Sequence, residues 1–220
     1  MADELTLPLF PLRTVLFPGM PLPLHIFEPR YREMLQRCLA GDRCFGVALI
    51  KRGVEVGGPA VPHAVGTVAR VVEVEALPDG RFEILTLGED RFQVLDVSDD
   101  RPYLVGRVRT IHDADPLDDA LVQLADAVAV AFRDLVAQLQ RLAGEPSAPP
   151  ELPDNPRQVS FAVASALQLP LPEKQSLLEL TSTAERLRRL MAAIRRETGL
   201  LHLVRESQRD LPSIGPFSTN

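Results

Sequence analysis

The sequence has only two cysteines and no long apolar run, and each shortage excludes a class of protein. Cys38 and Cys44 have no neighbouring histidine or cysteine pair, so they cannot complete a four-ligand zinc site. We expect buried reduced thiols, although a disulfide between them is geometrically conceivable. No apolar run approaches a membrane span, and the first residues lack the basic start and apolar core of a signal peptide. We therefore expect a cytoplasmic protein.

The sequence also lacks the charge that attracts nucleic acid. It has 24 basic and 30 acidic residues, a net charge of −6, so no overall field draws in RNA or an anionic membrane. Only Lys51 and Lys174 of the basic residues are lysine. We interpret the arginine excess as coding bias rather than phosphate recognition. The 220 residues permit one large or two small domains.

The common catalytic motifs are missing as well. No glycine precedes a lysine as a phosphate-binding loop requires, no serine lies in a G-x-S-x-G elbow, and no histidine pair has the H-E-x-x-H spacing. The four histidines, at positions 25, 63, 112 and 202, lie far apart. We predict structural or surface roles for them, and no catalytic, cofactor-binding or metal-binding residues.

An alternating apolar pattern begins at Val65 and predicts β-structure. We expect four antiparallel strands, at residues 65–76, 81–87, 91–97 and 103–111, with turns at Asp79–Gly80, at residues 88–90 and at residues 98–102. Gly106 is a candidate bulge. Upstream, the segment Phe10–Phe27 contains Pro11, Pro18, Pro21 and Pro23. Proline is tolerated on edge strands and at bends, so this segment is predicted to form short bent strands that close a small barrel.

The remaining segments predict helices. One helix is expected at about 29–40, with Gly41 as its C-cap, followed by a buried strand and a glycine- and proline-rich loop, Gly53–Ala64. Asp115–Pro116 is expected to begin a long helix that ends before Gly144, and Asn155–Pro156 a second one. A short helix follows, and Ser182 with Glu185 forms a capping box for the last. We predict an α+β protein: a barrel subdomain at residues 1–112, an α-helical bundle at 113–209 and a flexible tail at 210–220.

Two groups of charged residues have two interpretations each. The arginines of the last helix could form a nucleic-acid patch, but we expect a solvated helix face; they are Arg186, Arg188, Arg189, Arg195 and Arg196. The carboxylates Asp113, Asp115, Asp118 and Asp119 could suggest cation binding, but the spacing lacks the glycine and final glutamate of an EF-hand. We expect them to stabilise a helix N-terminus.

Three stretches of the chain together resemble the amino-terminal substrate-binding domain of the ATP-dependent Lon proteases. The specific elements are Pro11–Arg13, Phe17–Gly19, the hairpin at Gly80–Arg81, and the Lys-Gln-Ser-Leu-Leu-Glu run at Lys174–Glu179. The resemblance covers about Leu5 to Glu206. It implies a PUA-like antiparallel barrel with a helical bundle behind it. It also implies binding of unfolded or client polypeptides, with a separate protease or chaperone as a further partner.

By this resemblance we expect the chain to depart from the Lon plan, since it stops near residue 220, where the long coiled helix and motor would begin. We therefore expect a free-standing, non-catalytic module, and do not carry over ATP hydrolysis or proteolysis. The candidate protein-binding surface is the junction formed by Phe27, Glu28, Arg30 and Tyr31, because arginine and tyrosine are enriched at interaction hot spots. Alternatively, Phe27 and Tyr31 pack the barrel against its helix. The loop Gly53–Ala64 is a second candidate.

Two other functional classes stay open at this point. The first is RNA binding, suggested by analogy with PUA-like folds, but a fold does not determine function and the net charge argues against nucleic acid. The second is an enzyme with an unrecognised site.

Overall fold

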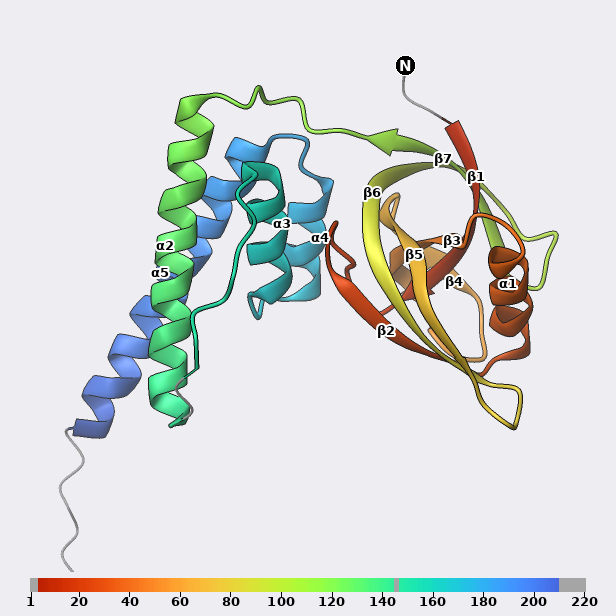
Figure 1. Cartoon of the computed structure of the whole chain (residues 1–220), viewed down its shortest axis with the longest axis horizontal. Coiled ribbons are helices and arrows are strands. Elements are labelled where there is room, and N and C mark those ends of the chain that lie inside the picture. The colour runs from red at the N-terminus through yellow and green to blue at the C-terminus, as the bar shows by residue number, and fades with distance from the viewer. Residues whose placement is uncertain (1–3, 145–146, 210–220) are drawn as a thin grey trace, which may run out of the picture.

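The computed structural model describes residues 4–144 and 147–209. Within them the strands are β1 (Glu4–Leu12), β2 (Pro21–Ile26), β3 (Cys44–Gly53), β4 (Ala60–Pro62), β5 (Val65–Ala76), β6 (Phe82–Ser98) and β7 (Leu104–Ile111). The helices are α1 (Pro29–Leu39), α2 (Asp119–Ala143), α3 (Pro156–Ala166), α4 (Leu171–Glu179) and α5 (Thr183–Arg209). The strands form a barrel with α1 against it, and the other helices lie together on one side of the barrel (Figure 1). This is the predicted α+β class.

Five strands close the barrel. Neighbouring strands pair in the order β1-β7-β6-β5-β3, and β1 and β3 complete the ring through a parallel pairing. The other pairings of the ring are antiparallel. β4 adds to β3 at the rim, and β2 pairs with β6. A closed ring removes the exposed edges that an open sheet would present to other chains.

The prolines lie where a strand has a partner on one side only. Pro8 lies opposite Val105 of β7, and Pro11 lies opposite Ala48 of β3. β2, with its prolines, pairs only with β6 among the described strands. A residue without an N–H loses no ladder bond on a side that has no partner. The proline-rich segment therefore helps to close the barrel, as predicted, although its first strand begins earlier, at Glu4.

β6 differs most from the prediction, because it is one strand of 17 residues rather than two strands joined by a turn. Its first part pairs with β2 and its second part with β7. Where the partner changes, Gly88 N donates to Met20 O at 2.9 Å and Gly88 O accepts from Gly19 N at 2.8 Å. A Cβ atom at Gly88 would lie 2.2 Å from the carbonyl oxygen of Phe17. Gly88 therefore permits close backbone approach and marks no turn.

Replacing Gly88 by alanine is expected to lower the free energy of unfolding by about 1–3 kcal/mol, the usual cost of overpacking. The added methyl group would meet the backbone of Phe17, which cannot rotate away as a side chain can. Gly199→Ala is the matched control, because nothing lies within 4 Å of its Cβ position on α5. Urea unfolding measures both variants, and unchanged stability of the Gly88 variant would contradict the close approach.

The starts of α2 and α5 correct the predicted role of Asp115. The N-cap of α2 is Asp118, whose side chain accepts a hydrogen bond from Leu121 N at 2.9 Å. Asp115 instead serves α5, where its carboxylate accepts from Ser182 Oγ at 3.1 Å and from Ala184 N at 3.2 Å. The acidic cluster thus divides between two helix N-termini, each of which offers unpaired backbone N–H groups.

Most other helix ends lie where the sequence predicts them. α2 ends before Gly144, which has φ 72°, and Asn155 accepts hydrogen bonds from the first backbone N–H groups of α3. Ser182 Oγ accepts from Glu185 N at 3.1 Å, one half of the predicted capping box. The C-cap of α1 is Ala40 rather than Gly41.

Gly106 of β7, a predicted bulge position, lies against Leu9 instead. A Cβ atom at position 106 would lie 2.7 Å from Leu9 Cδ1, so the glycine permits close packing of the two strands and does not mark a bulge.

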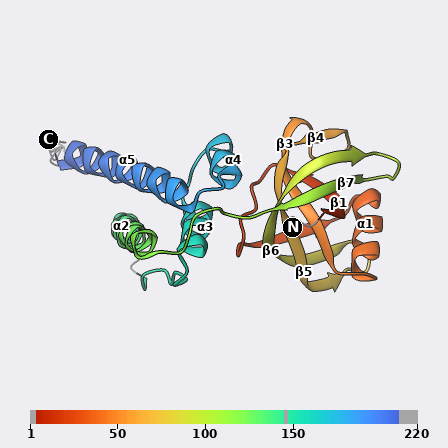
Figure 2. The same ribbon diagram turned by 90° about the horizontal axis from the view of Figure 1, so that it is seen from above.

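One apolar core joins the barrel to the helices. Val15, Phe17 and Leu49 of the barrel belong to the same cluster as the buried residues of α2, α3, α4 and α5. Figure 2 shows α3 and α4 between the barrel and the two long helices. The predicted boundary between the barrel subdomain and the helical bundle, at residues 112–113, falls between β7 and α2, and the division into subdomains stays a prediction. The predicted tail, 210–220, lies outside the described residues.

A second core fills the barrel beneath α1. Its buried residues include Phe10, Phe45, Met34 and Leu35. Cys38 and Cys44 are both buried and free, as predicted, and burial raises the pKa of the Cys38 thiol to about 11.

No helix among the described residues is long and apolar enough to cross a membrane.

A buried charge cluster corrects the expectation that Arg186 and Asp113 lie at the surface. The Asp113 carboxylate pairs with Arg91 of β6 and Arg186 of α5, and the side chains of all three residues are at most 2% exposed. Phe161 of α3 lies against both guanidinium groups, with centroid distances of 5.3 Å to Arg91 Cζ and 4.0 Å to Arg186 Cζ. Arg91 also donates to Leu178 O at the end of α4. The cluster therefore ties the barrel to three helices.

Candidate functional site

The predicted junction connects β2 to α1. β2 ends at Ile26, and Pro29 is the first residue of α1, a position where proline loses no helical hydrogen bond. Glu28 is the N-cap residue, with φ −67° and ψ 135°, and its side chain makes no cap bond. Its carbonyl oxygen accepts from Tyr31 N and Arg32 N at 3.0 and 2.9 Å. This geometry leaves the Glu28 carboxylate free for other contacts.

The four predicted site residues differ in exposure. Tyr31 is 5% exposed, and its ring centroid lies 4.1 Å from that of Phe10. Arg30 Cζ lies 4.5 Å from the Tyr31 ring centroid. Phe27 is 44% exposed, and its ring stacks on His25 at 5.7 Å. Tyr31 therefore packs α1 onto the barrel, whereas Phe27 presents its ring to solvent.

The two segments singled out in the sequence contact each other. Arg30 donates through Nη1 to Gly58 O at 3.1 Å and through Nη2 to Glu55 O at 3.4 Å. The Glu28 carboxylate accepts from Arg30 Nε at 3.1 Å and from Gly57 N at 3.2 Å. These polar contacts hold the loop between β3 and β4 over the start of α1. The sequence indicates each segment separately but not their meeting.

A cavity of about 210 Å³ lies between these segments. We call it the Phe27 cavity; it is lined by Phe10, Leu12, Pro23, Leu24, His25, Ile26, Phe27, Glu28, Tyr31, Glu55 and Val56. Arg30 is not part of the lining but ties its loop wall in place. The lining is largely apolar, with two carboxylates from the junction and the loop. Its volume is below the range of about 300–1,000 Å³ that ligand pockets occupy, so its size matches a single side chain rather than a whole small molecule.

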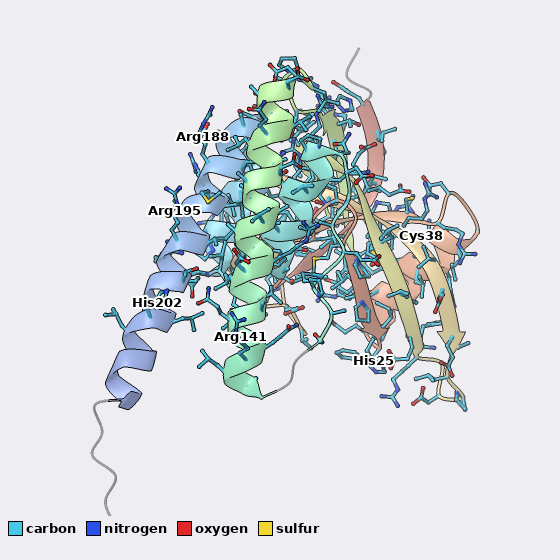
Figure 3. The ribbon with its side chains drawn as sticks, turned by 60° about the vertical axis from the view of Figure 1, so that its left-hand side comes forward. His25, Cys38, Arg141, Arg188, Arg195 and His202 are labelled. Carbon is cyan, nitrogen blue, oxygen red and sulfur yellow. The ribbon has the colours of Figure 1, made fainter. Side chains whose placement is uncertain are left out.

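The titratable residues that line the Phe27 cavity are His25, Glu28, Tyr31 and Glu55, and His25 Nδ1 lies 2.6 Å from Glu83 Oε1. Burial raises the pKa of Tyr31, with Arg30 opposing and Glu28 and Glu55 adding to the effect, so the phenol keeps its proton at neutral pH. Among the described residues, no group of three or more histidine, cysteine or acidic side chains is placed to hold a metal ion. His25 and His202 lie far apart in Figure 3.

Sequence reasoning missed the part of the lining that the strands contribute, which is Phe10 and Leu12 from β1 and Pro23, Leu24, His25 and Ile26 from β2. The signal was the alternation along Pro21–Ile26, in which buried and exposed residues take turns. The sequence-based prediction for this segment, Phe10–Phe27, is barrel closure only.

The run Lys174–Glu179 joins the helices to the barrel. Gln175 Nε2 donates to Val65 O of β5 at 3.0 Å and to Glu179 Oε1 at 2.8 Å. Lys174 Nζ donates to Ser165 O at the end of α3 at 2.9 Å. Burial lowers the pKa of Lys174. This run therefore fixes α4 between the barrel and α3.

The chain matches the family model described as the ATP-dependent protease La (LON) substrate-binding domain over residues 6–196. That match covers both the barrel and the helical part. The chain belongs to the Lon substrate-binding domain family. The predicted resemblance is thus confirmed.

Curated relatives of this Lon-family domain are much longer than the chain. It is 30% identical over 203 residues to the Lon protease of Anaeromyxobacter dehalogenans, covering 90% of this chain and 24% of that protein. It is 28% identical over 206 residues to the Lon protease of Roseiflexus castenholzii, covering 93% of this chain and 26% of that protein. The chain therefore spans about a quarter of these relatives.

Solved structures of similar size agree with the fold. A Lon N-terminal domain protein from Xanthomonas campestris superimposes with a TM-score of 0.63 at 29% identity, covering 86% of this chain and 98% of that one. The N-terminal domain of the Mycobacterium avium complex Lon protease gives a TM-score of 0.60 at 18% identity, covering 86% and 97%. The second likeness concerns the fold alone.

Proposed function

We propose that this Lon-family domain recognises unfolded or client polypeptides without catalysing a reaction, and that the Phe27 cavity receives an apolar side chain of the bound segment. The observation that carries the proposal is the exposed ring of Phe27 at an apolar cavity bounded by both candidate segments. In folded clients such side chains are buried, so the domain would prefer unfolded chains.

The cavity's size implies weak binding. Burying one leucine or phenylalanine side chain contributes about 1.5–3 kcal/mol, and association costs reduce the sum of such contributions. We expect micromolar-class affinity, as suits a module that samples many clients and hands them to a separate protease or chaperone. Salt should change the affinity little, because apolar burial rather than counterion release supplies the free energy.

Replacing Phe27 by serine is expected to weaken binding of an unfolded protein about tenfold, because a partly buried aromatic contact contributes about 1–2 kcal/mol. The measurement is fluorescence anisotropy with a labelled, permanently unfolded protein at two salt concentrations. Val130→Ser is the matched control, since Val130 is 57% exposed on α2. Arg30→Ala tests the hydrogen bonds from Arg30 to the loop between β3 and β4. Tyr31→Ala is less informative, because it would also remove the packing of Tyr31 on Phe10.

Three outcomes would contradict the proposal or its choice of surface. If the unfolded protein shows no saturable binding while an RNA oligomer binds with a steep salt dependence, RNA binding replaces polypeptide recognition. Turnover of a substrate by pure protein would favour an enzyme instead. If the unfolded protein binds but the Phe27 and Val130 variants behave alike, the cavity is the wrong surface.

A further inference from the structure

A second cavity lies on another side of the barrel, between its rim and α4. We call it the α4 groove; its volume is about 560 Å³, and it is lined by Lys51, Arg52, Val61, Pro62, His63, Ala64, Val94, Val97, Pro172, Gln175, Ser176 and Glu179. The α4 residues of the lining recur at helical spacing and form one face of that helix. The volume falls within the range of about 300–1,000 Å³ that ligand pockets occupy.

The α4 wall of the groove is held in place by two hydrogen bonds to the barrel. Gln175 donates to Val65 O at 3.0 Å, which ties the helical wall to β5. Arg91 donates to Leu178 O at 2.6 Å, which ties the end of α4 to β6. A ligand therefore meets a preformed α4 wall and does not have to order it, which lowers the cost of binding.

A β-bulge brings two consecutive cations to the same groove. In the pairing of β3 with β4, Ile50 lies opposite Pro62 and Arg52 opposite Val61, so Lys51 is an extra residue. Successive side chains of a regular strand point to opposite faces, and a bulge re-aims them. Lys51 and Arg52 consequently line the same cavity.

The cations of the α4 groove are available to a ligand. Lys51 and Arg52 are exposed, and neither forms an ion pair with any residue in the described part of the chain. Glu179 is already engaged, because it accepts from Gln175 and lies 3.7 Å from His63 Nδ1. Exposed Val61 and Val97, at 45% and 40%, add an apolar surface beside the cations.

We propose that the α4 groove binds an extended acidic segment of a polypeptide, with carboxylates at Lys51 and Arg52 and aliphatic side chains on Val61 and Val97. The peptide ligand rests on the proposed function, but the site and its chemistry differ from those of the Phe27 cavity. RNA fits less well, because no phenylalanine, tyrosine or tryptophan lines the groove to stack on a base. Carboxylates complement the free cations, and aliphatic groups match the valines.

The test uses the full chain and a short labelled peptide, blocked at both ends, in which leucine and aspartate alternate with glycine and serine. The double variant Lys51→Glu, Arg52→Glu should bind it about tenfold more weakly at low salt, because two attractions become repulsions. Wild-type binding should weaken between about 0.05 and 0.5 M salt as the charges are screened. A peptide with lysine in place of aspartate should bind the wild type more weakly than the acidic one.

The matched control is Arg188→Glu, Arg195→Glu, which makes the same change of net charge. Both arginines are exposed on the side of α5 turned away from the barrel (Figure 3). Equal effects of the two double variants would overturn the proposal, since only net charge would then matter. So would an RNA oligomer that binds through Lys51 and Arg52 when the acidic peptide does not bind.

The acidic peptide also separates this proposal from the Phe27 cavity. Phe27→Ser should leave its binding unchanged, because Phe27 does not line the α4 groove. A wild-type protein that binds the acidic peptide but shows no saturable binding of the unfolded protein would count against the Phe27 cavity alone. The reverse pattern would overturn the α4 groove alone.

Discussion

Replacing Asp113 by asparagine is expected to lower the free energy of unfolding by about 3–5 kcal/mol, the cost of removing one partner from a buried ion pair. Asparagine keeps the shape of the side chain but removes its negative charge. Arg91 and Arg186 would then lie buried without a carboxylate between them. The domain would lose a large fraction of a typical total stability of 5–15 kcal/mol.

The cluster can hold two cations with one carboxylate because other groups share the excess positive charge. Arg91 and Arg186 both donate to Leu180 O just beyond α4, where the C-terminal end of a helix carries partial negative charge. The face of the Phe161 ring attracts both guanidinium groups. These contacts supplement Asp113 but do not replace a full charge, so the variant should remain strongly destabilised.

The pH dependence gives a second readout of the same cluster. Burial alone would raise the pKa of Asp113, but Arg186, the Thr183 hydroxyl and Arg91 outweigh it and lower the pKa. A lowered carboxyl pKa stabilises the fold above the ordinary aspartate value of about 4 and stops doing so as the pH falls below the native pKa. The stability gap between wild type and Asp113→Asn should therefore shrink in acid.

Asp118→Asn is the matched control, because asparagine caps a helix about as well as aspartate does. It makes the same chemical change at the exposed N-cap of α2. Urea unfolding at neutral pH should show little effect there. A loss below about 1 kcal/mol for Asp113→Asn would mean that the cluster contributes no more than a surface pair.

The buried arginine shows where sequence reasoning fails. The apolar stripe of α5 includes Leu187, Leu190 and Ile194, and Arg186 lies beside it, one turn before Leu190. The sequence gives no reason to place a charged residue inside, since its partner Asp113 lies 73 positions earlier. Local periodicity identifies the helix and its buried face. It cannot identify a buried charge whose neutralising group is distant in the chain.

The same limit applies to β6. Gly88-Glu-Asp has the composition of a turn, and local statistics favour one there. The strand continues because Gly88 exchanges hydrogen bonds with Gly19, the last residue of the family element Phe17–Gly19, and with Met20, which follows it. The Asp79–Gly80 turn was predicted correctly, with Gly80 at φ 79°, because its cause is local. Sequence reasoning therefore located the turn that has a local cause and missed the continuity of β6, which has a tertiary cause.

The residues of the candidate site also divide into those that local sequence indicates and those that only tertiary contacts reveal. The proline-bounded junction and the glycine-rich loop could be selected from composition, because both interrupt regular structure. Their contact through Arg30 and Glu28 could not, since it joins residues nearly 30 positions apart. The sequence places Phe27 and Tyr31 at the same junction and favours Tyr31 as the hot-spot residue type. Only the packing of Tyr31 on Phe10 separates a buried ring from an exposed one.

Residues 113–209, produced without the barrel, are expected to lose the cooperative melting of the whole chain or to melt at a much lower temperature. The core of the helical part includes Val15, Phe17 and Leu49 of the barrel. Removing them exposes Phe161, whose ring lies 6.3 Å from that of Phe17, and leaves Asp113 with one arginine fewer. Most helix stability in proteins comes from such packing rather than from intrinsic propensity.

Circular dichroism melting of the fragment and of the whole chain at equal concentration tests this prediction. Adding the complementary fragment, residues 1–112, is the control, because it restores the missing partner surface and should raise the melting temperature. A fragment that melts cooperatively at the temperature of the whole chain would establish two independent domains. In that case neither the shared core nor the Arg91–Asp113–Arg186 cluster would contribute to the stability of the helical part, because both require the barrel.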